Sequence, residues 1–173
     1  MGFVLGVKRV SFLMSCFNGG EYVASCIESV LSQTYSNFDF IIINDGSNDN
    51  SLDILNHYQN LDARIKVFSK KNTGLADSLN FGFNRCTGSW IARIDADDMV
   101  SSTRLEDQLK LTNNTSVVFV GSGMHEINKS GRSGKTHLYP TDHDSLLKRL
   151  LSFDAFPPHS SALIQSEALR TVE

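Results

Sequence analysis

Short apolar runs alternate with segments of helical periodicity between residues 10 and 120, and this alternation limits the folds open to the chain. The runs are bounded by Gly, Asn, Asp or Ser and predict strands at residues 10–16, 38–43, 65–69, 90–94 and 117–120. Between them, apolar residues recur every three or four positions, which predicts helices near residues 23–31, 52–58, 75–83 and 105–111. Repeated strand–helix–strand units form right-handed crossovers. We therefore expect an α/β fold, a doubly wound and mostly parallel sheet with helices on both faces.

The pattern changes after residue 122. Residues 124–140 are rich in Gly, Ser, Lys and Arg and predict a hairpin or an irregular excursion. A helix is expected near residues 142–151 and a strand near residues 160–164. The length of 173 residues suits one domain. We expect a single domain over residues 1–173, with a different kind of structure in its last third.

Composition narrows the partners and the compartment. The chain has 16 Lys and Arg residues against 19 Asp and Glu, a net charge of -3, so a broad basic surface for nucleic acid is not expected. Its three cysteines lack a Cys-x-x-Cys spacing and are interpreted as reduced, buried thiols. There is neither an apolar run of about 18 residues nor a secretion signal at the start, and we expect a cytoplasmic protein.

Polar residues gather at the predicted strand ends. They occupy residues 15–18, 44–47, 70–74 and 95–98. Open parallel sheets bind ligands beyond the carboxyl ends of their strands, which all lie at one edge. This edge is therefore the predicted site of the chemistry.

The acidic stretch Asp95-Ala96-Asp97-Asp98 is the most informative part of that edge. Neighbouring carboxylates raise one another's pKa unless a cation compensates their charge. Mg²⁺ and Mn²⁺ take oxygen ligands and keep further positions for water and substrate phosphates. A metal clamp for a diphosphate is one interpretation. The other is an acidic loop before a helix that Ser101, Ser102 or Thr103 caps.

Other motifs are open or absent. Asp45 could accept a hydrogen bond from a nucleobase or ribose, or it could simply form an Asp-Gly-Ser turn. Neither Gly-x-Gly-x-x-Gly nor Gly-x-x-x-x-Gly-Lys-Ser/Thr occurs, which argues against a dinucleotide-binding domain and a P-loop nucleotidase. The basic stretch at residues 129–135 is interpreted as a solvated hairpin, with a phosphate-contacting lid as the alternative. The five histidines have no metal-ligand spacing, and only His159, after two prolines, is kept as a candidate.

Taken together, several motifs resemble one known family. The turn Asn18-x-x-Glu21-Tyr22, the strand end Asp45-Gly46-Ser47, the stretch 92–98 (ARIDADD), the motif Arg104-Leu105-Glu106-x-Gln108 and the stretch 158–162 (PHSSA) follow in the order and spacing of the family 2 glycosyltransferases. The resemblance covers roughly residues 9–170. It implies a type-A glycosyltransferase fold, which is Rossmann-like and binds a nucleotide-diphosphate sugar. Residues 9–122 would form the nucleotide-sugar-binding part, and residues 123–173 the incomplete start of the acceptor side.

The resemblance also implies roles for single residues. Asp97 and Asp95 would hold Mn²⁺ or Mg²⁺, with His159 approaching the metal or the diphosphate. Asp98 would lie in the donor pocket or just behind it. Ser15 and Phe17 would flank the nucleobase, and Asp45 would bond its edge. The nucleotide-sugar pocket as a whole would comprise Ser15, Phe17, Asn18, Glu21, Asp45, Asn72, Arg93 and Asp95.

The implied function is metal-dependent, inverting transfer of a sugar, most simply from a UDP-sugar, to a glycan or lipid-linked acceptor in polysaccharide biosynthesis. Such acceptors would bring the protein to the inner face of the membrane. Phe17 stands where the family usually has Tyr, and Asn44 where it usually has Asp, which affects nucleotide preference.

An inverting enzyme needs a general base to deprotonate the acceptor hydroxyl. In the family this carboxylate lies some way beyond the segment matching residues 167–170, and the sequence ends at Glu173. We therefore expect the general base beyond Glu173, assign no catalytic base, and expect a C-terminally truncated domain without turnover of its own. The alternative is a non-catalytic nucleotide-sugar-binding module. A nucleotidyltransferase ranks last, because Asn18-Gly19-Gly20 carries no lysine.

Overall fold

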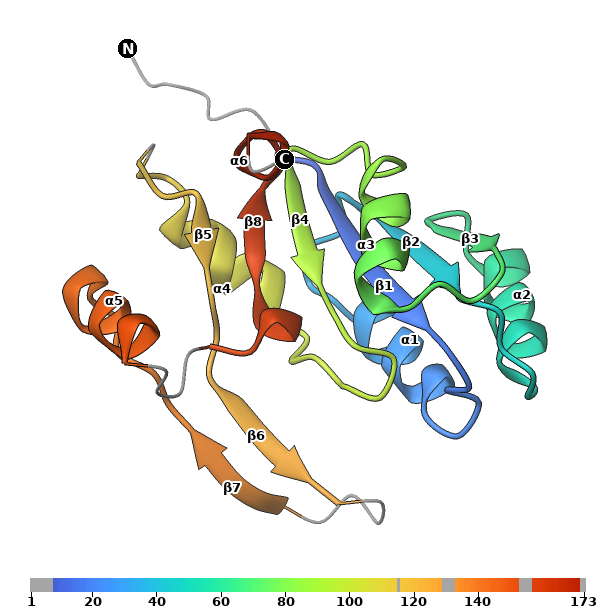
Figure 1. Cartoon of the computed structure of the whole chain (residues 1–173). Helices are drawn as coiled ribbons and strands as arrows, with labels where there is room; N and C mark the ends of the chain where they lie inside the picture. Colours follow the sequence, from blue (N-terminus) through green and yellow to red (C-terminus); the bar gives the residue numbers. More distant parts are fainter. Residues whose placement is uncertain (1–7, 115, 129–132, 153–156, 172–173) are drawn as a thin grey trace.

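The computed structural model describes residues 8–114, 116–128, 133–152 and 157–171 (Figure 1). Its centre is a six-stranded sheet with the order β3-β2-β1-β4-β8-β5. β1 pairs in parallel with β2 and β4, and β2 with β3, whereas β8 runs antiparallel to β4 and β5. The predicted α/β fold with a mostly parallel sheet is confirmed. The strands are β1 (Val10–Cys16), β2 (Phe38–Asn44), β3 (Ile65–Ser69), β4 (Trp90–Arg93), β5 (Phe119–Val120) and β8 (Leu163–Gln165).

Helices cover both faces of this sheet. On one face lie α1 (Val23–Leu31), α2 (Ser51–Leu61) and α4 (Arg104–Leu111), whose apolar side chains share a buried cluster with Phe12 and Phe40. On the other face α3 (Leu75–Phe83) and the short α6 (Ser166–Arg170) pack against a second cluster. Successive residues of a strand point to opposite faces, so β1 and β2 supply both clusters.

Burial on both faces explains the near-continuous apolar runs of the central strands. All seven residues of β2 are buried. The one carboxylate among them, Asp39, accepts hydrogen bonds from Arg9 (3.2 Å) and from the Thr87 hydroxyl (3.0 Å), and Lys66 lies 3.6 Å away. A buried charge is tolerated only with such partners. The alternation of apolar and polar residues that marks half-exposed strands is therefore missing here.

The last third departs from the prediction in detail. The strand expected at residues 117–120 shrinks to β5, because Val117 instead closes a turn by donating to the Asn114 carbonyl. The strand expected at residues 160–164 is a 3-10 turn, η1 (His159–Ser161), followed by β8, since the Ser161 amide and hydroxyl both donate to the Pro158 carbonyl.

The predicted hairpin and helix are present. β6 (Met124–Ile127) pairs antiparallel with β7 (Ser133–His137), and α5 (His143–Leu151) follows. Both lie beyond β5, away from the parallel strands (Figure 1). Of the helices in the described ranges, none combines the length and the apolar character needed to cross a membrane.

Three predictions fall wholly or partly on residues outside the described ranges. The first seven residues, where a secretion signal was not expected, are among them, as are residues 129–132 of the basic stretch. Glu173, beyond which the general base is expected, also lies outside the described residues. The absence of a secretion signal, the solvated loop and the position of the base therefore stay predictions.

The junction before β4 gives a test of the packing. A Cβ on Gly88 would lie 2.5 Å from the Ser11 nitrogen and 2.7 Å from the Val10 carbonyl carbon, so only backbone movement could relieve the clash. We expect Gly88→Ala to lower the free energy of unfolding by about 1–3 kcal/mol in urea titrations. The exposed neighbour Ser89 supplies the control, since Ser89→Ala removes only a 3.3 Å hydrogen bond from an exposed hydroxyl to the Arg9 carbonyl and should change this free energy by less than about 0.5 kcal/mol. Equal stability of Gly88→Ala and the parent would contradict this packing.

Candidate functional site

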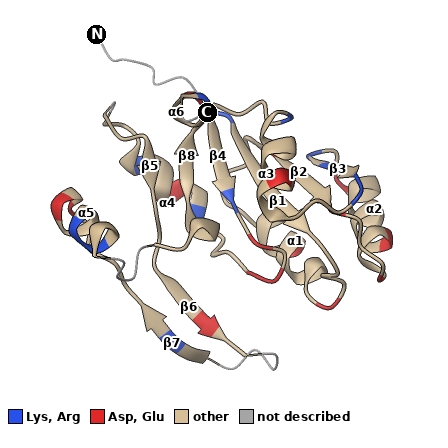
Figure 2. Cartoon of the chain, viewed as in Figure 1, with Lys and Arg blue, Asp and Glu red and all other residues tan. Residues whose placement is uncertain are grey.

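Four strand ends meet at one edge of the sheet. In the parallel register Cys16 pairs with Asn44 and Asn44 with Ser69, while Leu13 pairs with Arg93. The loops that leave β1, β2, β3 and β4 therefore emerge side by side. Figure 2 shows a basic position at the end of β4 followed at once by an acidic loop. The predicted clustering of polar residues at this edge is present in the structure.

Hydrogen bonds tie the loop after β1 to the loop after β2. The Asn18 amide donates to Ser47 Oγ (3.0 Å), and Asn18 Oδ1 accepts from the Asn48 amide (2.8 Å). Asn18 adopts a left-handed backbone (φ 51°), which Asn tolerates better than most residues. A Cβ on Gly20 would lie 1.9 Å from Asn50 Oδ1, so a larger residue there would displace the exposed Asn50 side chain. Asn18 thus organises the loop that carries its neighbour Phe17.

The residues around Asn18 remain open to a ligand. Phe17 is 51% exposed, unusual for a large aromatic side chain, and stands at the carboxyl end of β1. Ser15 is half-buried within β1, and Glu21 is exposed before α1. The aromatic ring of Phe17 is therefore available for stacking.

Asp45 is buried at the end of β2, with only 2% of its side chain exposed. Its Oδ1 accepts from Lys70 Nζ (2.7 Å) and the Thr73 amide (3.1 Å), and its Oδ2 accepts from the Gly74 amide (2.9 Å). Burial opposes ionisation, but these donors outweigh it and lower the pKa of Asp45. The Ser78 side chain also lowers this pKa, so the buried carboxylate of Asp45 is largely satisfied within the protein.

This arrangement holds the 70–74 loop against the loop after β2. Gly46 (φ 73°) comes so close to the 70–74 loop that a Cβ there would lie 2.8 Å from the Asn72 amide nitrogen. The exposed Asn72 is thereby fixed beside Asp45. Lys70 also lies 3.3 Å from Asp77 of α3. Lys70 was not among the predicted site residues, because it lies in a loop and forms its contacts through tertiary structure.

Arg93 is buried and reaches from β4 to the acidic loop. Its guanidinium donates to the Ile94 carbonyl and forms an ion pair with Asp95. Its Nε has no partner among the described residues. Arg93 also lines a hollow of about 490 Å³ between α3 and β4, together with His159 and Asn80 at its polar parts. The Nε–H of Arg93 is thus a buried donor near Asp95 without a partner in the described part of the chain.

The acidic loop suits a cation that also binds a ligand. Asp95 keeps one oxygen free of Arg93, and Asp97 is exposed. Desolvation raises the pKa of Asp98, the Ser160 side chain lowers it, and the charges of Asp95 and Asp97 raise it further. The oxygens of Asp95 and Asp97 that Arg93 leaves unpaired fit Mg²⁺ or Mn²⁺, which bind through one or two carboxylates plus phosphate oxygens.

The structure does not assemble a complete cage of metal ligands. Within the described ranges, no three His, Cys, Asp or Glu side chains form a group that could hold a metal ion. His159 is exposed at η1, which contacts β4, but it is not preassembled with Asp95 and Asp97. Its predicted role near the metal or diphosphate stays a prediction.

Buried side chains of α1 and of the residues just after it support the segment that follows the acidic loop. Gln33, just after α1, donates from Nε2 to the Ser101 carbonyl (2.6 Å) and accepts at Oε1 from the Leu105 amide (3.0 Å). The Ser29 hydroxyl accepts from the Val100 amide (3.1 Å). Gln33 fixes the path of residues 99–103, between the acidic loop and α4. The sequence places Gln33 just after the first predicted helix, but it does not show that Gln33 contacts Ser101 and Leu105.

Two polar residues of α4 form a second support. Arg104 Nη2 donates to the carbonyls of Arg93 (2.9 Å) and Ala162 (3.2 Å). Gln108 Nε2 donates to the carbonyl of Ser161 (2.8 Å). Arg104 and Gln108 lie four positions apart beside the buried Leu105 and Leu109. This spacing is the sequence pattern that could have indicated a polar function inside the fold.

The three cysteines are buried, Cys16 and Cys26 near this edge and Cys86 near the amino ends of β1 and β2. Cys16, Cys26 and Cys86 are free thiols, as predicted. Cys26 Sγ donates to the Asp95 carbonyl (3.3 Å), and burial raises the pKa of its thiol far above the ordinary value. They therefore serve as core residues and not as nucleophiles.

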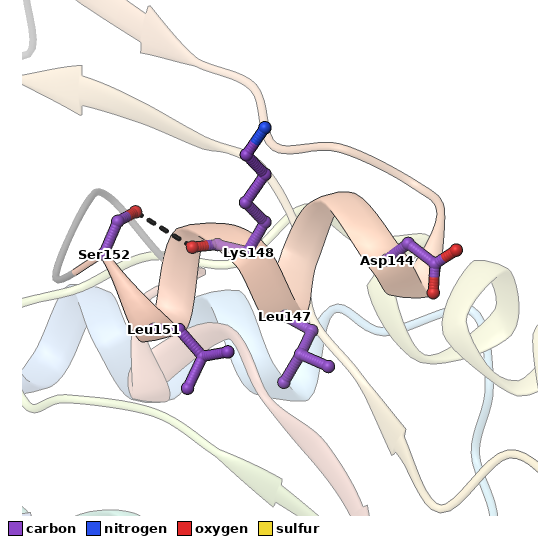
Figure 3. A pocket seen from close by; sticks show the side chains of 5 residues that line it. All are labelled: Asp144, Leu147, Lys148, Leu151 and Ser152. Carbon is purple, nitrogen blue, oxygen red and sulfur yellow. Dashed lines mark hydrogen bonds between the residues drawn. The ribbon is translucent and has the colours of Figure 1, made fainter.

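A second hollow lies on the exposed face of α5, beyond β5 and away from the parallel strands (Figure 1). It measures about 400 Å³ and is lined by Leu147, Leu151 and neighbouring polar residues. Figure 3 shows Leu147 and Leu151 pointing to the same side of the helix, with Lys148 pointing to the other. None of the predicted site residues lines it.

The family model described as glycosyl transferase family 2 matches residues 11–172. The chain belongs to this family. The resemblance found in the motifs is thereby confirmed.

Curated relatives are glycosyltransferases of bacteria. The chain is 32% identical over 166 residues to the O-antigen biosynthesis glycosyltransferase WbnJ of Escherichia coli, covering 94% of this chain and 64% of the relative. It is 36% identical over 129 residues to an uncharacterized glycosyltransferase of Rickettsia conorii, covering 75% of this chain and 21% of the relative. The chain thus spans between about a fifth and two thirds of the length of these relatives.

Solved structures share the fold. The S. aureus enzyme TarS, residues 1–349 in complex with UDP, matches with a TM-score of 0.77 and 19% identity over 94% of this chain and 48% of that one. The mannosyltransferase PcManGT of Pyrobaculum calidifontis, in complex with GDP-Man and Mn²⁺, matches with a TM-score of 0.63 and 16% identity over 66% of this chain and 35% of that one. The chain has the type-A glycosyltransferase fold.

The Asp45 network predicts a pH dependence of stability. A lowered folded-state pKa gives stability that is present above the unfolded value of about 4 and lost as pH falls through the folded value. We expect Asp45→Asn to be less stable than the parent at pH 7, and the difference to narrow as pH falls below about 4. Urea unfolding at a series of pH values measures it.

A matched variant sharpens this test. Lys70→Met removes a cation that lowers the pKa of Asp45, so the loss of stability on acidification should be smaller than in the parent and should be complete at a higher pH. A difference between Asp45→Asn and the parent that stays constant from pH 7 to about 3 would contradict the lowered pKa.

Proposed function

We propose that the chain forms the donor-binding part of a metal-dependent glycosyltransferase that transfers a sugar from a nucleotide-diphosphate sugar with inversion. The observation that carries this proposal is the placement of Asp95 and Asp97 at the end of β4, beside the ends of β1 and β2 and next to the unpaired N–H of Arg93. The family membership supports the type of reaction.

The nucleotide would lie across the ends of β1 and β2. Phe17, with Ser15 beside it, offers a face for stacking, and Asp45 would accept a hydrogen bond from an N–H of the base. Uracil and guanine present such N–H groups on their pairing edge. A UDP-sugar is the donor we propose, and the UDP and UDP-GlcNAc named for structures of TarS are consistent with it.

The diphosphate would extend from there toward the end of β4. Asp95 and Asp97 would hold Mn²⁺ or Mg²⁺, and Arg93 would donate its free N–H beside them. When bound, the cation stabilises the negative charge that develops on the departing diphosphate. Asn72, with Asn18 and Glu21, would border the same pocket, and His159 would approach the phosphates from η1. PcManGT was solved in complex with Mn²⁺, which supports the use of a divalent ion in this fold.

The acceptor belongs to the part of the fold that begins after residue 122. A growing glycan or a lipid-linked sugar in polysaccharide biosynthesis is the acceptor we propose, and the O-antigen biosynthesis named for WbnJ supports this class. We assign the general base to none of the described residues and propose that it lies beyond Glu173. A non-catalytic binding module is not favoured, because the family and these relatives are glycosyltransferases.

Calorimetric titration with UDP and GDP, with and without Mn²⁺, tests the donor site. We expect Mn²⁺ to strengthen binding of the preferred nucleotide, and Asp97→Asn to weaken the Mn²⁺-dependent binding by at least about tenfold. Asp144→Asn removes the same charge from α5, which lies beyond β5 and away from the proposed site, and should leave nucleotide binding unchanged. Nucleotide binding that ignores both Mn²⁺ and Asp97→Asn would contradict the proposed metal site.

A further inference from the structure

Arg104 is a buried cation that the proposed reaction does not use directly. It is 8% exposed, and among the described residues no carboxylate lies within ion-pair distance of it. Burial lowers its pKa to about 10, while the charge of Asp98 works in the opposite direction. The side chain therefore remains charged at neutral pH. An apolar residue of similar size commonly fills such a position at no cost in stability, so core packing alone does not account for the arginine.

The guanidinium joins two segments that border the acidic loop. One accepting carbonyl belongs to Arg93, two residues before Asp95, and the other to Ala162, directly after η1. The same two segments also contact each other, since the Arg93 amide donates to the Ala162 carbonyl (2.9 Å). The rigid guanidinium plane thus sets how the end of β4 lies against η1, which carries His159.

Gln108 extends this connection. Its Oε1 accepts from Arg104 Nε (3.2 Å), which fixes the plane of the guanidinium. Its Nε2 donates to the carbonyls of Ser161 (2.8 Å) and Val120 (3.3 Å). One turn of α4 therefore holds β4, η1 and β5 together through hydrogen bonds to their main chains.

We propose that Arg104, oriented by Gln108, is a positioning residue that fixes the acidic loop against η1 and so determines the Mn²⁺-dependent part of nucleotide binding. The inference rests on the proposed function, since it assigns a support to the same metal site. Arg104 itself does not touch the nucleotide or the metal. Its effect is transmitted by the main chain of Arg93 on one side and of Ala162 on the other.

The test separates metal-dependent from metal-free binding. The dissociation constant of UDP, or of GDP if the parent prefers it, is measured in EDTA and in saturating Mn²⁺ for Arg104→Met, Arg104→Lys, Gln108→Met and the parent. We expect Arg104→Met to lose about 10–100-fold of the affinity in Mn²⁺ while the constant in EDTA stays within about twofold. Arg104→Lys, which can reach both carbonyls but not Gln108 as well, should lie between the parent and Arg104→Met.

Lys110→Met is the matched control, because it removes a cation from the exposed face of the same helix and should change neither constant. If circular dichroism shows that Arg104→Met does not fold, Arg104→Lys and Gln108→Met decide by the same ratio of constants. Equal losses in EDTA and Mn²⁺, or no loss in either, would overturn the positioning role while leaving the proposed function intact. If the parent binds no nucleotide, the proposed function fails and this inference with it.

Discussion

The parallel register of β1 with β2 and β4 is the constraint on which the site depends. Each of these strands is buried on both faces, so a shift by one residue would move apolar side chains out of both clusters. With the register fixed, Asn18, Asp45 and Asp95 follow their strands at a common edge. The register leaves only the positions of the loops unspecified.

Buried polar side chains determine those positions. Asp45 holds the 70–74 loop through its two oxygens, and Gln33 holds the segment after the acidic loop. Each of these groups lies in the interior, where an unpaired donor or acceptor costs about 1–3 kcal/mol, so alternative loop paths are disfavoured. The site is therefore largely organised before any ligand arrives, which limits the entropy lost on binding.

The sequence predicted the parallel core well because its signals are local. Apolar runs and helical spacing depend on residues a few positions apart, and the ends of the strands located the polar edge. The supports of the loops could not be predicted in this way. Lys70 meets Asp45 from 25 positions away, and Arg104 meets the Ala162 carbonyl from 58 positions away. Such contacts exist only once the sheet has brought the segments together.

The weaker predictions lie in the last third for the same reason. The pattern at residues 160–164 indicated a strand, but the hydroxyl of Ser161 and the Pro158 carbonyl close a turn there first. Local side-chain bonds of this kind compete with strand pairing. The roles of Ser15, Phe17 and Asn72 came from the resemblance to the family and remain predictions, because exposure shows that they are accessible but not what they bind.

The central claim is that one metal ion binds at the edge formed by the ends of β1, β2 and β4. Paramagnetic broadening of backbone amide signals by Mn²⁺, in the presence of UDP, locates the ion directly. We expect substoichiometric Mn²⁺ to broaden the signals of residues 95–98 first, together with those of residues 159–161, and to leave the signals of the β6–β7 hairpin sharp. Broadening centred on Glu126 and His137 of that hairpin, or spread evenly over the chain, would contradict this claim.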